Sequence, residues 1–115
     1  MQLESRKLLF DVRQSVGRLA QFTAGKTLAD YLGDVLLRSA VERQFEIIGE
    51  ALAQLTKRDS ELAERISQRR RIIDFRNVIS HGYSEVDDKL VWDVLQSNLP
   101  TLRREIEGLL DVEEA

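Results

Sequence analysis

The only histidine of the chain, His81, follows Arg76 by five residues and Asn77 by four. A histidine near its ordinary pKa can take up or release a proton at neutral pH. An arginine can stabilise the negative charge that develops on a phosphate during its cleavage. These two residue types are the minimum set for metal-free RNA cleavage. In that chemistry His81 would handle the proton of the 2′-hydroxyl or of the leaving group.

Helical geometry brings only part of this set together. Asn77 and His81 are four residues apart, on the same face of a helix, so the Asn77 amide could hydrogen-bond the imidazole ring and fix its orientation. Arg76 lies about 140° around an ideal helix from His81. The two side chains therefore converge only where the helix distorts, or across an interface between chains. A histidine at a helix end is also a common cap, so a purely structural role stays open.

A cluster of arginines precedes the histidine. Residues 65–76 hold five arginines and a single acid, Asp74, in a chain whose formal net charge is -3. Proteins that bind polyanions are usually basic, so contact with nucleic acid would depend on this local patch. Arg69, Arg70 and Arg71 are the candidate RNA contacts. The alternative is a solvated helix face.

Composition excludes several kinds of site. The 115 residues include one histidine and no cysteine, so disulfides, thiolate metal clusters and sites with two histidines from one chain are ruled out. We therefore expect no metal and no cofactor. No apolar run approaches the roughly 18 residues that a membrane span needs. The first ten residues, which include Glu4, do not resemble a signal peptide. The expected location is the cytoplasm, with no membrane contact.

The spacing of apolar residues predicts an all-α fold, and one proline and 6 glycines are too few for an all-β fold. Helices are expected over residues 3–22, 27–55 and 61–81, and the polar segment 84–88 is expected to start the last helix. We expect a single domain over residues 1–115, an up-and-down four-helix bundle with room for one extra short helix. The acidic tail, residues 111–115, is expected to be frayed.

Helix boundaries are marked by polar residues and by proline. Thr27 should cap the second helix together with Asp30, and Ser60 should cap the third. The third helix should break near residues 67–68, and the last helix should kink or restart at Pro100.

Three acids, Glu42, Glu46 and Glu50, are spaced four apart and form one line along the second helix. They could face a cleft and pair with arginines, or they could form an ordinary exposed stripe. The exposed stripe is favoured for Glu42 and Glu50. Phe45 and Trp92 are expected in the core rather than as groups that stack on bases.

Residues 76–83, Arg-Asn-Val-Ile-Ser-His-Gly-Tyr, resemble the R-x4-H-x-Y motif of the HepT toxins, which belong to the HEPN superfamily of all-α RNases. The resemblance extends to further segments and covers about Ser39 to Leu110; those segments are residues 40–52, 72–75, 86–87, 91–92 and 99–100. Many relatives carry a Pro and a Trp before the Ile72–Ile73 pair. This chain has Ile-Ser-Gln-Arg-Arg-Arg over residues 66–71 instead, which leaves the local turn open and adds positive charge.

The resemblance implies a homodimer in which two copies of the motif meet at a cleft, so that one histidine per chain is enough. It implies a metal-independent endoribonuclease with Arg76 and His81 as the catalytic pair. Asn77 and Asp74 would be supporting residues. The implied partner is a small nucleotidyltransferase antitoxin of the MntA type, which would inactivate the toxin by adenylylating Tyr83.

Two other functions stay open beside the toxin. The chain could be a non-catalytic adaptor or nucleotide-binding partner subunit of a small nucleotidyltransferase. It could also be a plain helical dimerisation module.

Overall fold

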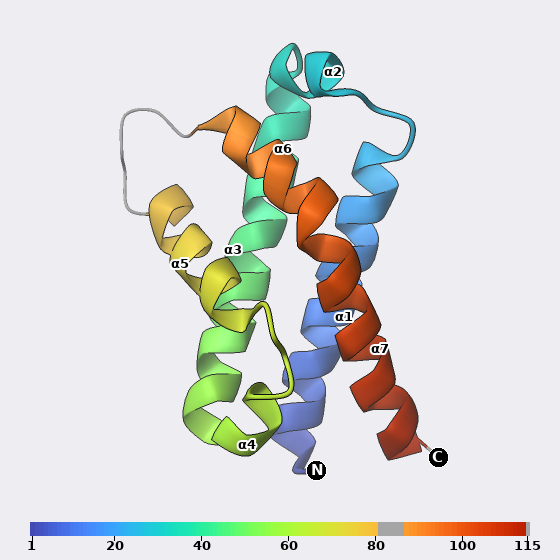
Figure 1. Cartoon of the computed structure of the whole chain (residues 1–115), viewed down its shortest axis with the longest axis vertical. Helices are drawn as coiled ribbons and strands as arrows, with labels where there is room; N and C mark the ends of the chain where they lie inside the picture. The colour runs from blue at the N-terminus through green and yellow to red at the C-terminus, as the bar shows by residue number, and fades with distance from the viewer. Residues whose placement is uncertain (81–86, 115) are drawn as a thin grey trace.

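Figure 1 shows the computed structural model of the chain, in which residues 1–80 and 87–114 are described. All regular structure within these two ranges is helical. The helices there are α1 (Leu3–Thr23), α2 (Leu28–Leu32), α3 (Val35–Arg58), α4 (Ser60–Ala63), α5 (Arg69–Ser80), α6 (Asp88–Ser97) and α7 (Leu99–Glu114). The prediction of an all-α fold is confirmed. His81 and Tyr83 lie outside the described residues.

The long helices run up and down in sequence order. α1 and α3 form an antiparallel central pair, and α5 packs on α3 (Figure 1). α6 leads into α7, which returns along α1. The four limbs are therefore α1, α3, α5 and the consecutive pair α6–α7, as predicted. α2 and α4 are short additional helices, one more than expected. No helix within the described residues is both long enough and apolar enough to cross a membrane.

The core lies between these limbs, and each of them contributes apolar side chains to it. Phe45 of α3 is fully buried and meets Phe75 of α5 edge to face, with ring centroids 5.1 Å apart. Trp92 of α6 packs on the core beside the buried ring of Tyr31, at 5.5 Å between centroids. Both expected core aromatics are thus confirmed. The contact between Phe45 and Phe75 attaches α5 to α3.

The prediction of one unbroken helix over residues 27–55 is wrong. α2 ends at Leu32, and α3 starts after Asp34, whose carboxylate accepts a hydrogen bond from the backbone N–H of Leu37 (3.1 Å). Arg38 donates to the backbone carbonyls of Tyr31 and Leu32 at the end of α2, where a helix leaves its last carbonyls incompletely paired. Apolar residues continue through this corner at a helical spacing, so periodicity alone does not reveal the break.

The capping box at Thr27 is confirmed. Its hydroxyl accepts from the N–H of Asp30 (3.2 Å), and the Asp30 carboxylate accepts from the N–H of Thr27 (2.9 Å). These hydrogen bonds, the backbone one first, lower the pKa of Asp30. The prediction of Ser60 as a cap is off by one residue. Asp59 caps α4, because its carboxylate accepts from the N–H of Leu62 (3.2 Å).

The predicted break near residues 67–68 is confirmed, because α4 ends at Ala63 and α5 begins at Arg69. Side chains of the last limb hold this connection. The Glu105 carboxylate accepts from the N–H of Ser67 (3.1 Å), and Asn98 donates to the Gln68 amide oxygen (2.6 Å). The expected restart near Pro100 is also present, since α7 begins at Leu99. The turn between α4 and α5 is therefore anchored to α7 at Ser67.

Replacing Asp34 by alanine is expected to destabilise the protein by about 1 kcal/mol, because the first turn of α3 loses its side-chain cap. Asp34→Asn should retain most of the stability, since asparagine caps equally well. Urea unfolding followed by circular dichroism measures the difference. Gln14→Ala, at an exposed position of α1, is the control. An Asp34→Ala variant as stable as this control would contradict the assignment of the cap.

Candidate active site

The motif arginine is carried by α5, which is an amphipathic helix. Ile72 and Phe75 are buried, and Ile79 packs against the same core from the next turn. This spacing of three and four residues gives α5 one apolar face, and that face lies mainly on α3. The side of the helix that carries Arg70 and Asp74 is exposed. The contact between α5 and α3 therefore determines which side chains of α5, the helix before His81, face solvent.

Arg76 lies at the edge of the α3–α5 contact, with 22% of its side chain exposed. Its Nη1 donates to the carboxylate of Glu50 on α3. Its Nη2 donates to the side-chain oxygen of Asn77 at 2.8 Å. The guanidinium is thus held from two directions, by the neighbouring residue and by a residue 26 positions earlier in the chain.

The stem of Arg76 lies directly on the backbone of α3 at Gly49. A Cβ atom at position 49 would lie 2.9 Å from both Cγ and Cδ of Arg76 and closer still to its Cβ. Real side chains essentially never approach so closely, so a larger residue at position 49 would displace either the arginine or the helix. Glycine is needed here for close approach rather than for its backbone angles.

The guanidinium keeps free hydrogen-bonding capacity. Arginine has five N–H donors, and the contacts with Glu50 and Asn77 use Nη1 and Nη2. Nε is buried without an acceptor among residues 1–80 and 87–114. Since Arg76 engages the Asn77 oxygen, the amide NH2 of Asn77 also stays a donor. The remaining N–H groups of Nη1 and Nη2 and the Asn77 NH2 are donors that suit an anion such as a phosphate oxygen.

The other predicted arginines, Arg69, Arg70 and Arg71, form the first turn of α5. Arg69 is half-buried, and Arg70 and Arg71 are exposed. Arg71 lies 4.0 Å from the Asp93 carboxylate of α6, a surface pair that adds little to stability. The three cations occupy the first turn of a helix, where the dipole favours acids. This arrangement opposes helix stability, so stabilisation of the helix end does not account for it.

The line of acids on α3 divides into three different environments. Glu50 is exposed, as expected, but it also pairs with Arg76. Glu46 lies 3.8 Å from Arg43 within the same helix. Glu42 is half-buried rather than exposed as expected, and burial followed by the charges of Asp88 and Glu46 raises its pKa. Only Glu50 reaches the motif arginine.

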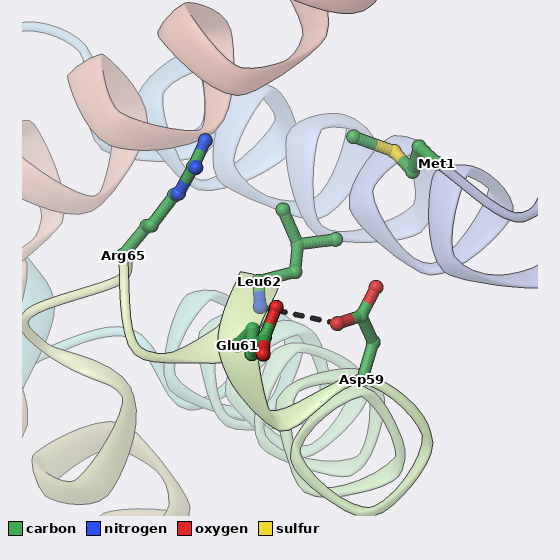
Figure 2. Close-up of a pocket in the computed structure, with 5 residues that line it drawn as sticks. All are labelled: Met1, Asp59, Glu61, Leu62 and Arg65. Atoms are coloured by element: carbon green, nitrogen blue, oxygen red, sulfur yellow. Dashed lines mark hydrogen bonds between the residues drawn. The ribbon is translucent and has the colours of Figure 1, made fainter.

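A pocket of about 230 Å³ lies at the end of the bundle that holds α4 and the N-terminus. Figure 2 shows the side chains of Arg65 and Asp59 around it, with the Asp59 carboxylate bound to the backbone N–H of Leu62. Because this carboxylate caps α4, it is not a free catalytic acid. Arg65 belongs to this pocket, so the arginine run of the sequence is divided between two places. No group of three or more potential metal-ligating side chains gathers within the described residues.

Residues 12–109 match the family model described as "Ribonuclease HepT-like". This chain belongs to the HepT-like ribonuclease family. A HepT-like relative from Thermococcus cleftensis, named "Probable ribonuclease HepT", is 28% identical over 109 residues, which cover 95% of this chain and 98% of that protein. A protein of Methanocaldococcus jannaschii with a provisional RNase name is 26% identical over 102 residues, covering 89% and 93% of the two chains.

A third relative, from Caldanaerobacter subterraneus subsp. tengcongensis, also carries a provisional RNase name. It is 27% identical over 109 residues, which cover 95% of this chain and 96% of that protein. No solved structure matches the chain. The family membership predicted from residues 76–83 is thus confirmed.

Sequence reasoning missed Gly49 and the partner of Glu50 in this HepT-like chain. Gly49 carries a detectable signal, because a glycine in the middle of a long helix is unfavourable relative to alanine. Such a glycine indicates that another element approaches closely. The contact between Glu50 and Arg76 has no local signal, since it joins two helices 26 positions apart.

Gly49→Ala is expected to destabilise the protein by about 1–3 kcal/mol, because the added methyl group overlaps the Arg76 stem. Gly17→Ala is the matched control. It also lies mid-helix, but no atom lies within 4 Å of its added Cβ. It should be neutral or stabilise the protein by roughly 0.5–1 kcal/mol. Urea unfolding of both variants tests this, and equal stability changes would contradict the close approach of α3 and α5.

Proposed function

We propose that this protein is a metal-independent endoribonuclease and the toxin of a HEPN–nucleotidyltransferase toxin–antitoxin pair, acting on RNA in the cytoplasm. Arg76 and His81 are the catalytic pair, and Asn77 and Asp74 are supporting residues. The observation that carries the proposal is the Arg76 guanidinium, held by Glu50 and Asn77 five residues before His81 in a chain of the HepT-like family.

The proposed reaction transfers a phosphodiester from one oxygen of RNA to another. His81 takes the proton of the 2′-hydroxyl, and the 2′-oxygen attacks the adjacent phosphorus. The bond to the 5′-oxygen breaks, and a protonated histidine supplies the proton that this oxygen needs. Arg76 stabilises the charge that builds on the phosphate oxygens. The products are a 2′,3′-cyclic phosphate and a 5′-hydroxyl end.

Two copies of the chain would complete this site. The attacking 2′-oxygen and the leaving 5′-oxygen lie on opposite sides of the phosphorus, so a proton acceptor and a proton donor are best supplied by two separate groups. A homodimer would bring two histidines to one cleft. The outer side of α5 is exposed in the single chain, which leaves room for a second copy and for RNA. Arg69, Arg70 and Arg71 are the proposed contacts with the RNA backbone.

The proposed antitoxin is an MntA-type nucleotidyltransferase that adds AMP to Tyr83. The chain has two tyrosines, and the other one, Tyr31, is fully buried. Burial raises the pKa of Tyr31, together with the charges of Asp88 and Glu42, so its hydroxyl is a poor nucleophile. A negatively charged nucleotide on Tyr83 would repel RNA from the motif.

Arg76→Ala and His81→Ala are each expected to reduce cleavage of a labelled RNA by at least about 100-fold, because each removes a group that acts in the transition state. Wild-type cleavage should persist in EDTA and leave cyclic phosphate ends. Gel analysis of the cleavage products measures both effects. Arg18→Ala, an exposed arginine of α1, is the control for nonspecific loss of charge.

Two results would contradict the ribonuclease. Unmodified wild-type protein that never cleaves RNA would favour the adaptor or partner subunit of a nucleotidyltransferase. Cleavage lost in EDTA and restored by added metal would exclude the metal-free reaction.

Co-expression with the nucleotidyltransferase is expected to add AMP to wild-type protein and to Tyr31→Phe, but not to Tyr83→Phe. Tyr31→Phe is a mild control, because the Tyr31 hydroxyl is buried without a hydrogen-bond partner among the described residues. Intact-mass spectrometry measures the addition. No mass gain in the wild type would indicate inhibition by simple occlusion instead.

A further inference from the structure

Arg76 belongs to a continuous hydrogen-bonded chain that links α3 to α5. Gln54 donates to one carboxylate oxygen of Glu50 (3.1 Å), and Arg76 donates to the other. Arg76 then donates to Asn77. Both oxygens of Glu50 are therefore engaged, and the guanidinium is hydrogen-bonded through both Nη1 and Nη2.

The contact between Glu50 and Arg76 is better explained by orientation than by stability. Glu50 is 55% exposed, and ion pairs with an exposed partner contribute little to folding free energy. A carboxylate beside the arginine of an RNA-binding site also weakens attraction for phosphate. Its presence is explained if the direction of the guanidinium matters more than the net charge.

We propose that Glu50 and Gly49 are positioning residues for Arg76. Gly49 lets the arginine stem lie on the α3 backbone, and Glu50 fixes the direction in which the guanidinium points. A guanidinium held in place loses less freedom when it binds the transition state. The effect on RNA cleavage rests on the proposed function, whereas the orientation of Arg76 does not.

The opposite role for Glu50 makes different predictions. If its carboxylate only occupied the place of a phosphate, then RNA would have to displace it. Removing the charge would in that case increase RNA affinity and cleavage, and it would not matter how the charge was removed. A glutamine at position 50 separates the two roles, because its amide oxygen can still accept from Arg76 while it carries no charge.

The experiment compares kcat and KM for Glu50→Ala, Glu50→Gln and the control Glu46→Ala. Glu46 lies one turn earlier on α3 and pairs with Arg43 instead. Glu50→Ala should lower kcat roughly 10- to 100-fold with a smaller change in KM, since a misdirected guanidinium fails chiefly in the transition state. Glu50→Gln should restore activity to within about threefold of wild type through its neutral hydrogen bond. Glu46→Ala should cleave as wild type does.

Side-chain NMR of Arg76 provides a readout that does not depend on catalysis. The guanidinium resonances should indicate hindered rotation in wild type and in Glu50→Gln, and faster rotation in Glu50→Ala. Equal rotation in all three proteins would overturn the proposal, whatever their activity. So would full activity in Glu50→Ala, or faster cleavage in both Glu50 variants. If wild type does not cleave RNA but holds Arg76 rigidly through Glu50, the proposed function fails and the positioning role stands.

Discussion

The candidate site depends on the close approach of α3 and α5 at Gly49. Gly49 has no side chain, so the stem of Arg76 lies directly on the α3 backbone and its guanidinium reaches Glu50. The contact between Phe45 and Phe75 lies one helical turn away along α3 and fixes the same register. A shift of α5 along α3 would therefore disturb the aromatic core and the motif arginine together. The packing of α5 on α3 therefore determines the geometry of the site.

The positive charges at the start of α5 destabilise the helix. Three arginines occupy the first turn, where the backbone dipole is positive. They are tolerated because the helix depends on burial of Ile72 and Phe75 rather than on its own end effects. The surface of the helix is thereby free to carry positive charge, and the overall negative charge of the chain does not prevent a local attraction for RNA.

Sequence patterns correctly predicted the features of the fold that depend on residues close together in the chain. The apolar spacing of α5, the Thr27–Asp30 capping box and the break before Arg69 follow from residues within a few positions of each other. The break at Asp34 escaped detection because the apolar repeat continues across it. The partner of Glu50 escaped for a different reason. It is chosen by the distance between α3 and α5, which no repeat on α3 encodes.

Gly49 and Glu50 also alter what an R-x4-H spacing means. On an isolated helix Arg76 would extend into solvent, and its guanidinium would sample many directions. In this fold two adjacent residues of another helix restrict it, one by lacking a side chain and one by carrying a carboxylate. The spacing places the arginine and the histidine on the chain, but α3 determines where the arginine points. The spacing alone therefore does not define the geometry of the site, which also depends on the helix against which the motif packs.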